Sequence, residues 1–511
     1  MAKLIAACLA LAGISLLLPS EPSYDPWAWL VWGRELAHGS LDTGGGPSWK
    51  PLPVAFTTLV ARLEGLDEGL PAALWVLVAR AGALLALAMA FRLVSRLAGG
   101  GVAGAFGGAV AAVVLFLTPD WFQFTAHGSE APLAVALMFW AIQRHLDGRH
   151  GHVVVLGTLA CLLRPELFPF LALYLLWAWR AAPKVRPLLA GVLILLAAAW
   201  IVPEWIGAGN PLDGGRQARS EPVWSLSNAE QPWLRALERV HNHAGLATEL
   251  LALVAVAWAL VRRRWAVIVL AAAALAEVGV YVVMTESGFS GNPRYVLPAL
   301  AVASVLAGVG TAALIETGAR FSGWLAHPQR VGVSRAGLLP CVAGGAAGLA
   351  VVAVLGAPFL DERERQLRSD ARQVDLRMDY HRDLARAVDE VGGPSAIAAI
   401  GTATANRALH SRLAWELRVP IDQVEAVTDH RVVFRSLRER LNGSVYMRGR
   451  AKSRRTLARV GGIWVYRRNG ITFPLARRRL EAIGRPFTSG LQGIHTSARV
   501  GRHFGARVVT R

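Results

Sequence analysis

The chain has 511 residues, of which 54% are hydrophobic and 17% charged, and its formal net charge is +19. With a mean hydropathy of +0.39, this composition is that of a protein that crosses a membrane several times, and it excludes an ordinary water-soluble domain. The three cysteines all lie in apolar runs, at spacings that fit neither a metal site nor a disulfide framework.

Eleven apolar runs have the length, or nearly the length, of a membrane-spanning helix. They cover residues 3–19, 71–91, 101–118, 130–143, 152–163, 167–179, 188–206, 245–261, 265–285, 294–314 and 338–359. The short pair 152–163 and 167–179 is either a hairpin of two thin spans or one kinked helix. Only the hairpin places every short basic connection on one side. This favours eleven spans, with the N-terminus in the cytoplasm and the C-terminus outside.

The longer polar segments then fall on the outer side of the membrane. They are residues 20–70, 118–130, 203–244 and 286–298, together with the short Arg164-Pro165-Glu166. Binding and catalytic residues lie mostly on loops that a rigid scaffold positions, so we expect the active face to be extracytoplasmic.

The first outer loop, residues 20–70, contains two short helical segments. Asp25-Pro26 has the form of a helix start, with the aspartate capping free amides. The following WAWLVWGREL is too short to span and rich in Trp, which predicts a helix in the membrane interface. The glycine-rich LDTGGGPS separates it from a second apolar segment, WKPLPVAFTTLVARL. Two interfacial helices are therefore expected to form a platform at the outer surface.

These features resemble the GT-C superfamily of integral-membrane glycosyltransferases over roughly residues 1–320. The resemblance rests on an acidic residue just outside the first span, on the large outer loop, on WKPLP (49–53) and on GSEAPLAVALMFWAIQRHLDGR (128–149). The segments LLRPELFPFLALY and GNPRYVLPAL are similar to actinobacterial members of the superfamily. The resemblance implies transfer of a sugar from a polyprenyl-phosphate donor to an acceptor on the outer face.

The acidic residue departs from the pattern of the superfamily in one respect. Many members carry two adjacent acidic residues after the first span, whereas here Asp25 follows Tyr24, with only Glu21 nearby. This departure makes the assignment of the catalytic base depend on the chemistry of the individual side chains.

Two carboxylates are candidates for the catalytic base that takes the proton of the acceptor hydroxyl. Asp25 is the first, and the alternative is that it only caps its helix. Glu130 is the second, and the alternative is a first-turn glutamate favoured by the helix dipole. His127 would share the helical face of Glu130 if the helix begins there. One carboxylate is sufficient for inversion by direct displacement, because phosphate is already a good leaving group.

Cationic residues near the outer span ends are candidates for binding the departing phosphate. Arg294 has the strongest claim because arginine holds phosphate oxygens with two donors; the alternative is snorkelling to the interface. Arg164 and Glu166 lie at membrane depth, and they form either an ion pair that holds a hairpin or part of the donor site. Lys50 is a third cation or an interface anchor. Tyr295, beside Arg294, completes the substrate-binding candidates.

Other chemistries find little support in the sequence. His241 and His243 have no evident third ligand, so we expect no metal site. There is no phosphate-binding loop, dinucleotide motif or Ser/His/Asp constellation, so we expect no cofactor. The lipid-linked sugar donor is a substrate.

The last 150 residues change in character. Residues 361–389 are predicted to be a charged helical connector and 390–475 a small α/β domain outside the membrane, followed by a basic, disordered tail over 476–511. Within the domain, strands are expected at 396–401, at RVVFRS and at GIWVYRRNG, with a helix whose one face carries Leu409, Leu413 and Leu417.

Nearly all of the net positive charge lies in residues 431–511, which hold 20 Lys and Arg against 2 acidic residues. This predicts contact with anionic lipid or an acidic glycan. Nucleic acid is not expected, because no nucleic-acid-binding module is present.

The predicted fold is thus an all-α polytopic membrane protein with GT-C-like topology and a small C-terminal α/β domain. Its predicted function is sugar transfer from a polyprenyl-phosphate donor to a cell-envelope glycan or lipid on the outer face of the plasma membrane. A transporter or flippase of envelope precursors is the first alternative, although no internal repeat supports it. A noncatalytic envelope scaffold is the second, since function follows the site and not the fold.

Overall fold

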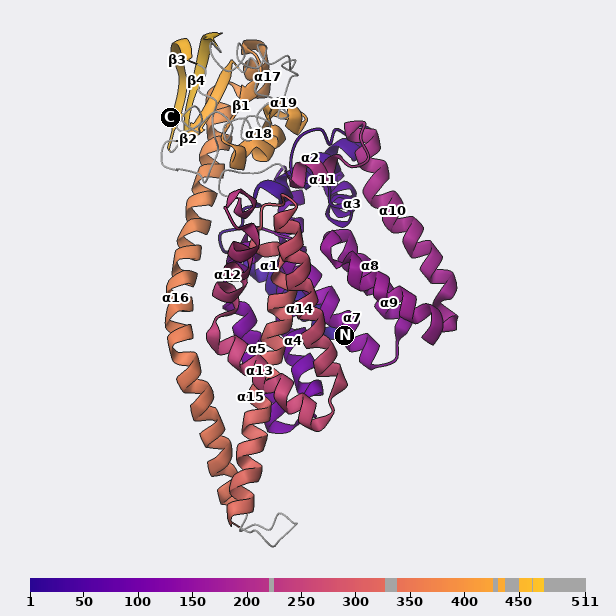
Figure 1. Cartoon of the computed structure of the whole chain (residues 1–511). Coiled ribbons are helices and arrows are strands. Elements are labelled where there is room, and N and C mark those ends of the chain that lie inside the picture. Colours follow the sequence, from indigo (N-terminus) through magenta and orange to yellow (C-terminus); the bar gives the residue numbers. More distant parts are fainter. Residues whose placement is uncertain (220–224, 327–337, 426–430, 437–449, 462, 473–511) are drawn as a thin grey trace.

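The structure, a computed structural model, describes residues 1–219, 225–326, 338–425, 431–436, 450–461 and 463–472 (Figure 1). A bundle of apolar helices lies beneath a small region that contains the four strands (Figure 1). The expectation of a helical membrane part with a small C-terminal sheet is confirmed.

Each of the eleven apolar runs coincides with a helix of the bundle. These helices are α1 (Ala2–Ser15), α4 (Leu70–Leu97), α5 (Gly101–Phe116), α7 (Ala131–Leu146), α8 (His150–Leu163), α9 (Phe168–Ala181), α10 (Arg186–Ala208), α13 (Leu246–Arg262), α14 (Trp265–Glu286), α15 (Leu297–Ala326) and the first part of α16 (Leu338–Glu390).

Among the described residues, four helices are long and apolar enough to cross a membrane. They are Leu70–Leu97, Pro183–Ala208, Trp265–Glu286 and Leu297–Ala319. A fifth is reached if α12 (Pro232–Ala244) and α13, bent by 86° at Gly245, are one broken span. The chain is therefore a membrane protein, and the number of eleven spans stays a prediction.

Helices α5 and α15 cross closely at the centre of the bundle. A side chain at Gly107 would overlap the carbonyl oxygen of Gly308, and a side chain at Gly308 would overlap that of Gly107. Small residues at such crossings let two membrane helices approach backbone to backbone. The buried side chains around this crossing come from α1, α4, α5, α7, α13, α14 and α15.

Helices α8 and α9 form a hairpin. The His150 ring lies 5.1 Å from the Trp177 ring, and Gly157 faces Leu171, so the two helices run side by side in opposite directions. Each has 14 residues, or about 21 Å, which is less than the ~30 Å of a bilayer core. The hairpin interpretation of this pair is confirmed, with Arg164-Pro165-Glu166 at its apex.

The outer loop forms α2 (Tyr24–Ala37), α3 (Pro51–Val60) and the short η1 (Ala61–Gly65). The two predicted helices are present, but the expectation that the membrane surface buries the α2 tryptophans is wrong, and the interfacial position of the helices stays a prediction. Trp27, Trp29 and Trp32 are at most 1% exposed, because α3, α4 and the C-terminal region cover α2 on several sides. A tryptophan-rich helix can bury its apolar surface against protein as well as against lipid.

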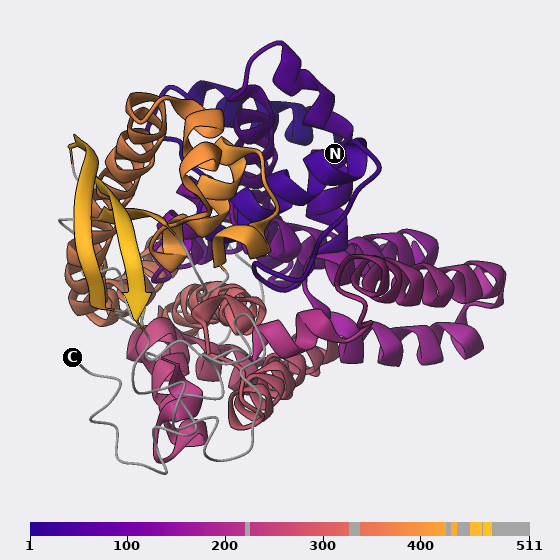
Figure 2. The ribbon, with the colours of Figure 1, turned by 90° about the horizontal axis from the view of Figure 1, so that it is seen from above.

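Three further helices lie at the outer side of the bundle or beside it. They are α6 (Trp121–Ala126), α11 (Asp213–Ala218) and α12, and short 3-10 turns connect several helices: η2 (Pro165–Leu167), η3 (Pro183–Val185), η4 (Leu226–Asn228) and η5 (Pro293–Tyr295). Seen from above, the α8–α10 group projects away from the rest of the bundle, on the side opposite the strands (Figure 2).

The C-terminal α/β region begins on the last turns of α16. It contains α17 (Gly393–Ile400), β1 (Ala403–Thr404), η7 (Arg407–Leu409), α18 (His410–Leu417), α19 (Ile421–Glu425), β2 (Val432–Ser436), β3 (Arg450–Val460) and β4 (Ile463–Thr472). The sheet has the order β1-β2-β4-β3; β1 and β2 are parallel, and the other two pairings are antiparallel.

The predicted elements of this region are mostly confirmed. RVVFRS and GIWVYRRNG are strands β2 and β4, and α18 follows the expected apolar face. The strand expected at 396–401 is wrong, because these residues form most of α17, whose start at Gly393-Pro394 suits a first helical turn. Strand β3 was not predicted, and residues 476–511 lie outside the described residues. Helix α16 runs through both the last apolar run and the charged connector.

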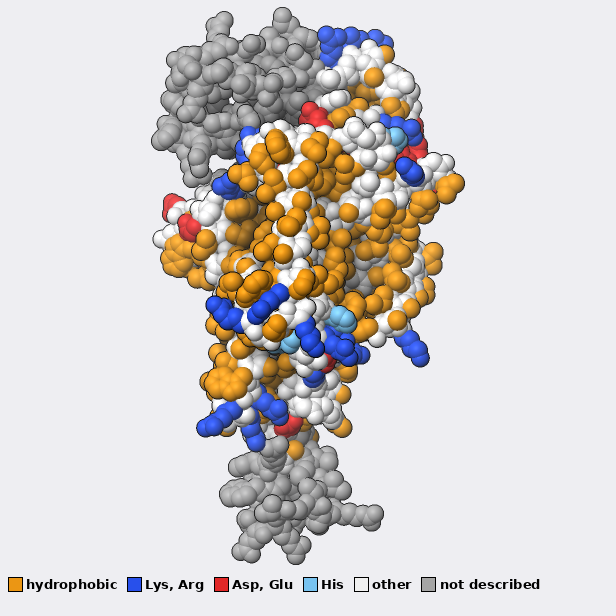
Figure 3. All heavy atoms as spheres, turned by 90° about the vertical axis from the view of Figure 1, so that its right-hand side faces the viewer, with side chains coloured by type: hydrophobic (Ala, Val, Ile, Leu, Met, Phe, Trp, Pro, Cys, Tyr) orange, Lys and Arg blue, Asp and Glu red, His pale blue; other side chains and the backbone are white. Residues whose placement is uncertain are grey.

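The surface of the bundle is divided into an apolar band and a basic end. Figure 3 shows apolar side chains over a broad band, with Lys and Arg gathered below it. The α9–α10 and α13–α14 connections, at the end away from the C-terminal region, carry Arg180, Lys184, Arg186 and Arg262–Arg264. Such basic helix ends are typical of the cytoplasmic side of a membrane protein.

Candidate active site

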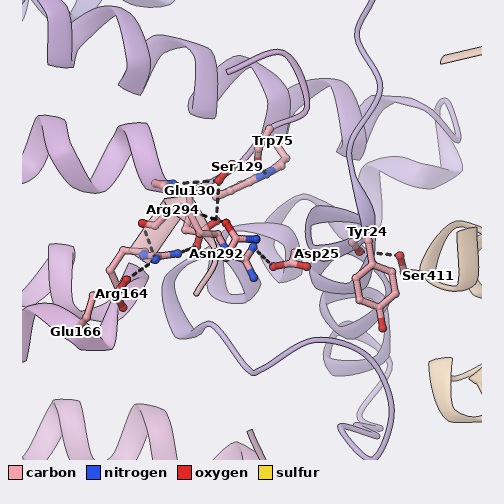
Figure 4. A network of polar contacts seen from close by, with 12 residues as sticks. Tyr24, Asp25, Trp75, Ser129, Glu130, Arg164, Glu166, Asn292, Arg294 and Ser411 are labelled. Atoms are coloured by element: carbon pink, nitrogen blue, oxygen red, sulfur yellow. Dashed lines mark hydrogen bonds and ion pairs between the residues drawn. The ribbon is translucent and has the colours of Figure 1, made fainter. Parts of the chain in front are cut away.

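Asp25 lies in the first turn of α2, but it does not cap the helix. The helix begins after Ser23, whose carbonyl accepts from the Trp27 N–H at 3.1 Å. The Asp25 carboxylate instead forms an ion pair with Arg294 (Figure 4). The capping interpretation of Asp25 is therefore wrong. Its side chain is 13% exposed and that of Arg294 is 19% exposed, so this ion pair remains accessible.

Arg294 is held by the turn between α14 and α15. The Asn292 side-chain oxygen accepts from the Arg294 N–H at 3.1 Å and starts the short η5. The Gly291 carbonyl accepts from the Tyr281 hydroxyl at 2.6 Å and from the Arg239 guanidinium at 2.7 Å. These bonds fix the backbone before Arg294, so its guanidinium is presented at the outer end of α15 in a defined direction.

Arg164 joins three parts of the chain. Its guanidinium contacts the Glu130 carboxylate at 2.8 Å, pairs with Glu166, and donates to the Arg294 carbonyl at 2.8 Å (Figure 4). All three ionised side chains are at most 1% exposed. The Tyr295 ring lies 5.2 Å from the same guanidinium and adds a cation–π contact. A single arginine thus ties the start of α7 and the hairpin apex to the α14–α15 turn.

Lys50 is a buried cation at the start of α3. Its side chain faces the Trp200 ring at 5.7 Å, and the indole N–H of the neighbouring Trp49 donates to the Ala199 carbonyl at 3.0 Å. Within the part of the chain that the structure describes, Lys50 has no hydrogen bond and no ion pair, although it is only 3% exposed. The pKa of Lys50 is lowered to about 8, chiefly by burial and also by Arg164 and Arg294, although Glu130 and Glu166 act in the opposite direction.

The sequence-predicted residues therefore separate into a connected cluster and one outlier. The cluster consists of Asp25, Lys50, Glu130, Arg164, Glu166, Arg294 and Tyr295, which are joined by ion pairs, cation–π contacts or electrostatic proximity. Its charges are three cations and three carboxylates. An anion can therefore bind here in two ways. It can displace a carboxylate from one of the arginines, or it can bind Lys50, which has no anionic partner in direct contact.

His127 is the outlier. Helix α6 ends at Ala126 and α7 begins at Ala131 with Glu130 as its N-cap, so the expectation that His127 and Glu130 share one helical face is wrong. Burial lowers the pKa of His127 to about 3, and its Nδ1–H donates to the Glu21 carbonyl at 2.9 Å. The ring is thus a neutral hydrogen-bond donor that holds the segment before α2.

Glu277 is a buried carboxylate that sequence reasoning missed. It lies in the middle of α14, is 3% exposed, and interacts electrostatically with Glu166 and Arg164. Neither of its carboxylate oxygens has a hydrogen-bond partner among the described residues. The signal in the sequence was a single charge within the apolar run 265–285, and charges at membrane depth are costly and often functional.

The pairs formed by His241 and His243 are local. His241 contacts Glu249 at 3.0 Å, and His243 contacts Asp120 at 3.4 Å. In the described ranges, no three His, Cys, Asp or Glu side chains come together as a metal-binding group.

Among the solved structures that the chain resembles are two crystal structures of ArnT from Cupriavidus metallidurans. The apo structure shares 14% sequence identity, covers 91% of this chain and 97% of its own, and has a TM-score of 0.51. The chain has the fold of ArnT. The structure of ArnT bound to undecaprenyl phosphate shares 13% identity at the same coverage, with a TM-score of 0.46. No protein-family model and no curated protein matches the chain. The expected GT-C-like fold is confirmed by the likeness to apo ArnT.

Glu35, near the end of the outer-loop helix α2, is expected to make stability depend on pH. The pKa of Glu35 is raised to about 7, chiefly by burial and also by the charges of Asp42 and Asp422, although the hydrogen bond from the Asp42 N–H and the charge of Arg34 act in the opposite direction. A carboxyl whose pKa is raised on folding contributes stability below its unfolded pKa of about 4.3, and this stability is lost as the pH rises through 7.

Replacing Glu35 by glutamine should therefore leave the thermal unfolding midpoint unchanged at pH 4 and raise it at pH 8, by on the order of 1–3 °C. Thermal unfolding of the purified protein in detergent at both pH values measures this difference. An equal effect of the substitution at the two pH values would contradict the assignment.

Proposed function

We propose that the chain is a membrane glycosyltransferase that moves a sugar from a polyprenyl-phosphate donor to an acceptor on the outer face. The observation that carries the proposal is the buried, unpaired Lys50 in the same cluster as the accessible Asp25–Arg294 pair. A buried ammonium without a directly contacting anion is costly, and a phosphate group would supply that contact. Asp25 supplies the base that the same reaction requires.

Arg294 changes its partner in the proposed reaction. Before the donor binds, the guanidinium is paired with Asp25. The donor phosphate, held by Lys50, competes for Arg294, because arginine binds phosphate oxygens through two parallel N–H donors. The Asp25 carboxylate then loses its cation and becomes free to accept a proton. Binding of the donor thereby prepares the base.

The chemical step is a direct displacement at the anomeric carbon. The acceptor hydroxyl oxygen forms a bond to this carbon while the bond to the phosphate oxygen breaks. The hydroxyl proton passes to Asp25, and the electron pair of the broken bond leaves on the polyprenyl phosphate, whose charge Lys50 and Arg294 stabilise. One displacement inverts the configuration at this carbon.

Asp25 is a better base than Glu130 for a physical reason. The Glu130 side chain is 0% exposed and holds the Arg164 guanidinium at 2.8 Å, with Ser129 at 3.2 Å. A carboxylate buried in this way is needed to neutralise Arg164 and is closed to an acceptor. We therefore assign Glu130, Arg164 and Glu166 to the support of the phosphate-binding residues, with Tyr295 packed against both arginines.

The surroundings of the reaction follow from the sequence and are part of the proposal. The acceptor is a cell-envelope glycan or glycolipid at the plasma membrane, in an enzyme of actinobacterial type. The basic residues 431–511 meet anionic lipid, and no nucleic acid takes part. The resemblance to the GT-C superfamily supports the acceptor and the type of enzyme, and the charge of residues 431–511 supports the contact with anionic lipid.

Analysis of envelope glycolipids and polysaccharides from a deletion strain tests the proposal. We expect one sugar to be missing from an envelope glycan, with the unused lipid-linked donor accumulating. An unchanged profile with altered uptake of a solute would favour a transporter. An unchanged profile with normal uptake would favour a noncatalytic scaffold.

Removing the charge of Lys50 should weaken donor binding. We expect Lys50→Met to lower the affinity for undecaprenyl phosphate about 10- to 100-fold, which is the value of one charge-assisted hydrogen bond. The pKa of about 8 adds a second signature: the affinity of the unmodified protein falls above pH 8, and that of the variant does not. Native mass spectrometry or titration in detergent measures both. Lys184→Met, at the opposite end of the bundle, is the matched control, and an equal loss there would contradict the assignment.

The orientation of the chain is tested by cysteine labelling in a cysteine-free background. Exposed Ser40 and Glu390, changed singly to cysteine, should react with an impermeant maleimide in intact cells. Arg263→Cys should react only after permeabilisation, because its connection carries the basic residues typical of the cytoplasmic side. Labelling of position 390 only after permeabilisation would overturn the placement of the C-terminal region.

A further inference from the structure

The C-terminal α/β region lies directly on the helix that carries Asp25 (Figures 1 and 2). At the start of α2, the Ser411 hydroxyl donates to the Tyr24 carbonyl at 2.6 Å. Arg412 contacts the Glu21 carboxylate at 3.2 Å, and its guanidinium stacks 4.1 Å above the Trp27 ring. These two neighbouring residues of α18 therefore hold the turn that leads into and includes Asp25.

Glu21 connects the same turn to α16. Its carboxylate faces His381 at 2.9 Å and accepts from the Trp27 indole N–H at 3.1 Å, in addition to its contact with Arg412. Glu21 and His381 are both largely buried. The segment before α2 is thus held by two helices of the C-terminal region together.

The far end of α2 is held by the same helix α18. The Arg34 guanidinium donates to the Trp415 carbonyl at 3.1 Å and to the Ala414 carbonyl at 3.4 Å, and it stacks 4.5 Å from the Trp415 ring. The Trp415 ring also lies 5.5 Å from that of Trp27. Helix α18 therefore contacts α2 along its length, and the side chains between them belong to one buried apolar cluster.

The glycine run of the outer loop fits this contact. A side chain at Gly45 would stand 2.6 Å from the backbone nitrogen of Asp422 and 2.7 Å from its Cα, closer than packing allows. Gly46 has a φ of +96° and lies against Ile421 and Trp32. The outer loop therefore approaches α19 backbone to backbone, which explains why this stretch consists of glycines.

Tyr24 and Asp25 connect the docking contact to the ion pair. They are consecutive residues, and Figure 4 shows the Asp25 side chain directed at Arg294, with Ser411 meeting Tyr24 on the other side. We propose that the C-terminal α/β region positions the base. Ser411 and Arg412 fix the first turn of α2, and this holds the Asp25 carboxylate where it can release Arg294 and then accept the proton of the acceptor hydroxyl. The catalytic part of this inference rests on the proposed function.

The size of the expected effect follows from geometry. Loss of the Ser411 hydroxyl removes one hydrogen bond, worth about 1 kcal/mol, and leaves the apolar contact in place, so the fold persists. A displacement of a catalytic group by about 1 Å lowers the rate about 100-fold. Among the described residues, the partners of the Lys50 and Arg294 side chains are Trp200, Asp25 and Tyr295 and none of them belongs to α18, so we expect the donor site to be unchanged. The signature of positioning is thus a lower kcat with an unchanged affinity for the donor.

Four variants and a control test the inference. Ser411→Ala and Arg412→Met are expected to lower kcat about 10- to 100-fold and leave the affinity for undecaprenyl phosphate within about 2-fold of the unmodified protein. Ser411→Thr keeps the hydroxyl and Arg412→Lys keeps the charge, so both should recover most of the rate. Arg418→Ala, at the end of the same helix and paired at 2.9 Å with Glu68, removes a contact far from Asp25 and should change neither quantity.

Hydrogen exchange provides a readout that does not need the reaction. Peptides that cover residues 21–31 should exchange faster in Ser411→Ala and Arg412→Met than in the unmodified protein and in Arg418→Ala. Unchanged exchange in these peptides would overturn the inference, as would faster exchange with an unchanged kcat. If the unmodified protein transfers no sugar from any lipid-linked donor, the proposed function fails, and the exchange result alone decides whether the region positions the first turn of α2.

Discussion

Asp25→Asn is expected to abolish sugar transfer, with kcat lowered about 100- to 10,000-fold, the usual contribution of a general base. The amide is close in size to the carboxylate, so the protein should accumulate normally. Binding of undecaprenyl phosphate should be unchanged or tighter, because Arg294 no longer has a competing carboxylate partner. Turnover with a lipid-linked sugar donor and the affinity for the donor phosphate, measured on the same preparation, separate these two effects.

Glu130→Gln serves as the comparison, because it changes the other candidate carboxylate. Its charge balances a fully buried Arg164, so the expected damage is to folding: less protein and a lower unfolding midpoint, with the remaining folded protein keeping part of its activity. Full activity of Asp25→Asn would remove Asp25 as the base. A stable, inactive Glu130→Gln would transfer that role to Glu130.

The sequence predicts the helices well because their signal is local. Apolar runs longer than about 18 residues are read directly from hydropathy, and the basic connections indicate which ends lie together. The same argument selected the α8–α9 hairpin, which the ring contact between His150 and Trp177 confirms. Proximity of Lys50, Asp25 and Arg294 was expected only in the sense that all three lie on the outer side.

The remaining features depend on contacts between distant parts of the chain. The local sequence predicts that the membrane interface buries Trp27 and Trp32, because nothing near them in the chain indicates that α18 and Ile421 pack against them. Asp25 followed the local pattern of a helix cap, and a partner 269 residues away took its carboxylate instead. Strand β3, RAKSRRTLARV, is rich in basic residues and has no regular apolar alternation, so its pattern does not identify a strand, and only pairing with β4 establishes it.

Arg164→Met is expected to destabilise the folded protein by about 3–5 kcal/mol, the cost of leaving a buried charge without its partner. The Glu130 and Glu166 carboxylates are at most 1% exposed, so water cannot replace the guanidinium. The stability of Arg164→Lys should lie between those of the unmodified protein and Arg164→Met. The lysine ammonium keeps the charge, but it cannot reach both carboxylates and the Arg294 carbonyl as the planar guanidinium does. The yield after membrane extraction and the thermal unfolding midpoint in detergent rank the three proteins by stability.

A combined variant separates the two roles considered for Arg164. Adding Glu130→Gln and Glu166→Gln to Arg164→Met removes the two carboxylates that Arg164→Met leaves without a cation. This should recover most of the lost stability, because a buried ion network destabilises the fold chiefly when one partner is removed and the other remains charged. Recovery of folding without recovery of donor binding would show that Arg164 also supports the phosphate site through its bond to the Arg294 carbonyl. If Arg164→Met were instead as stable as the unmodified protein and failed only to bind undecaprenyl phosphate, Arg164 would be a direct phosphate ligand and the supporting role assigned to it would be wrong.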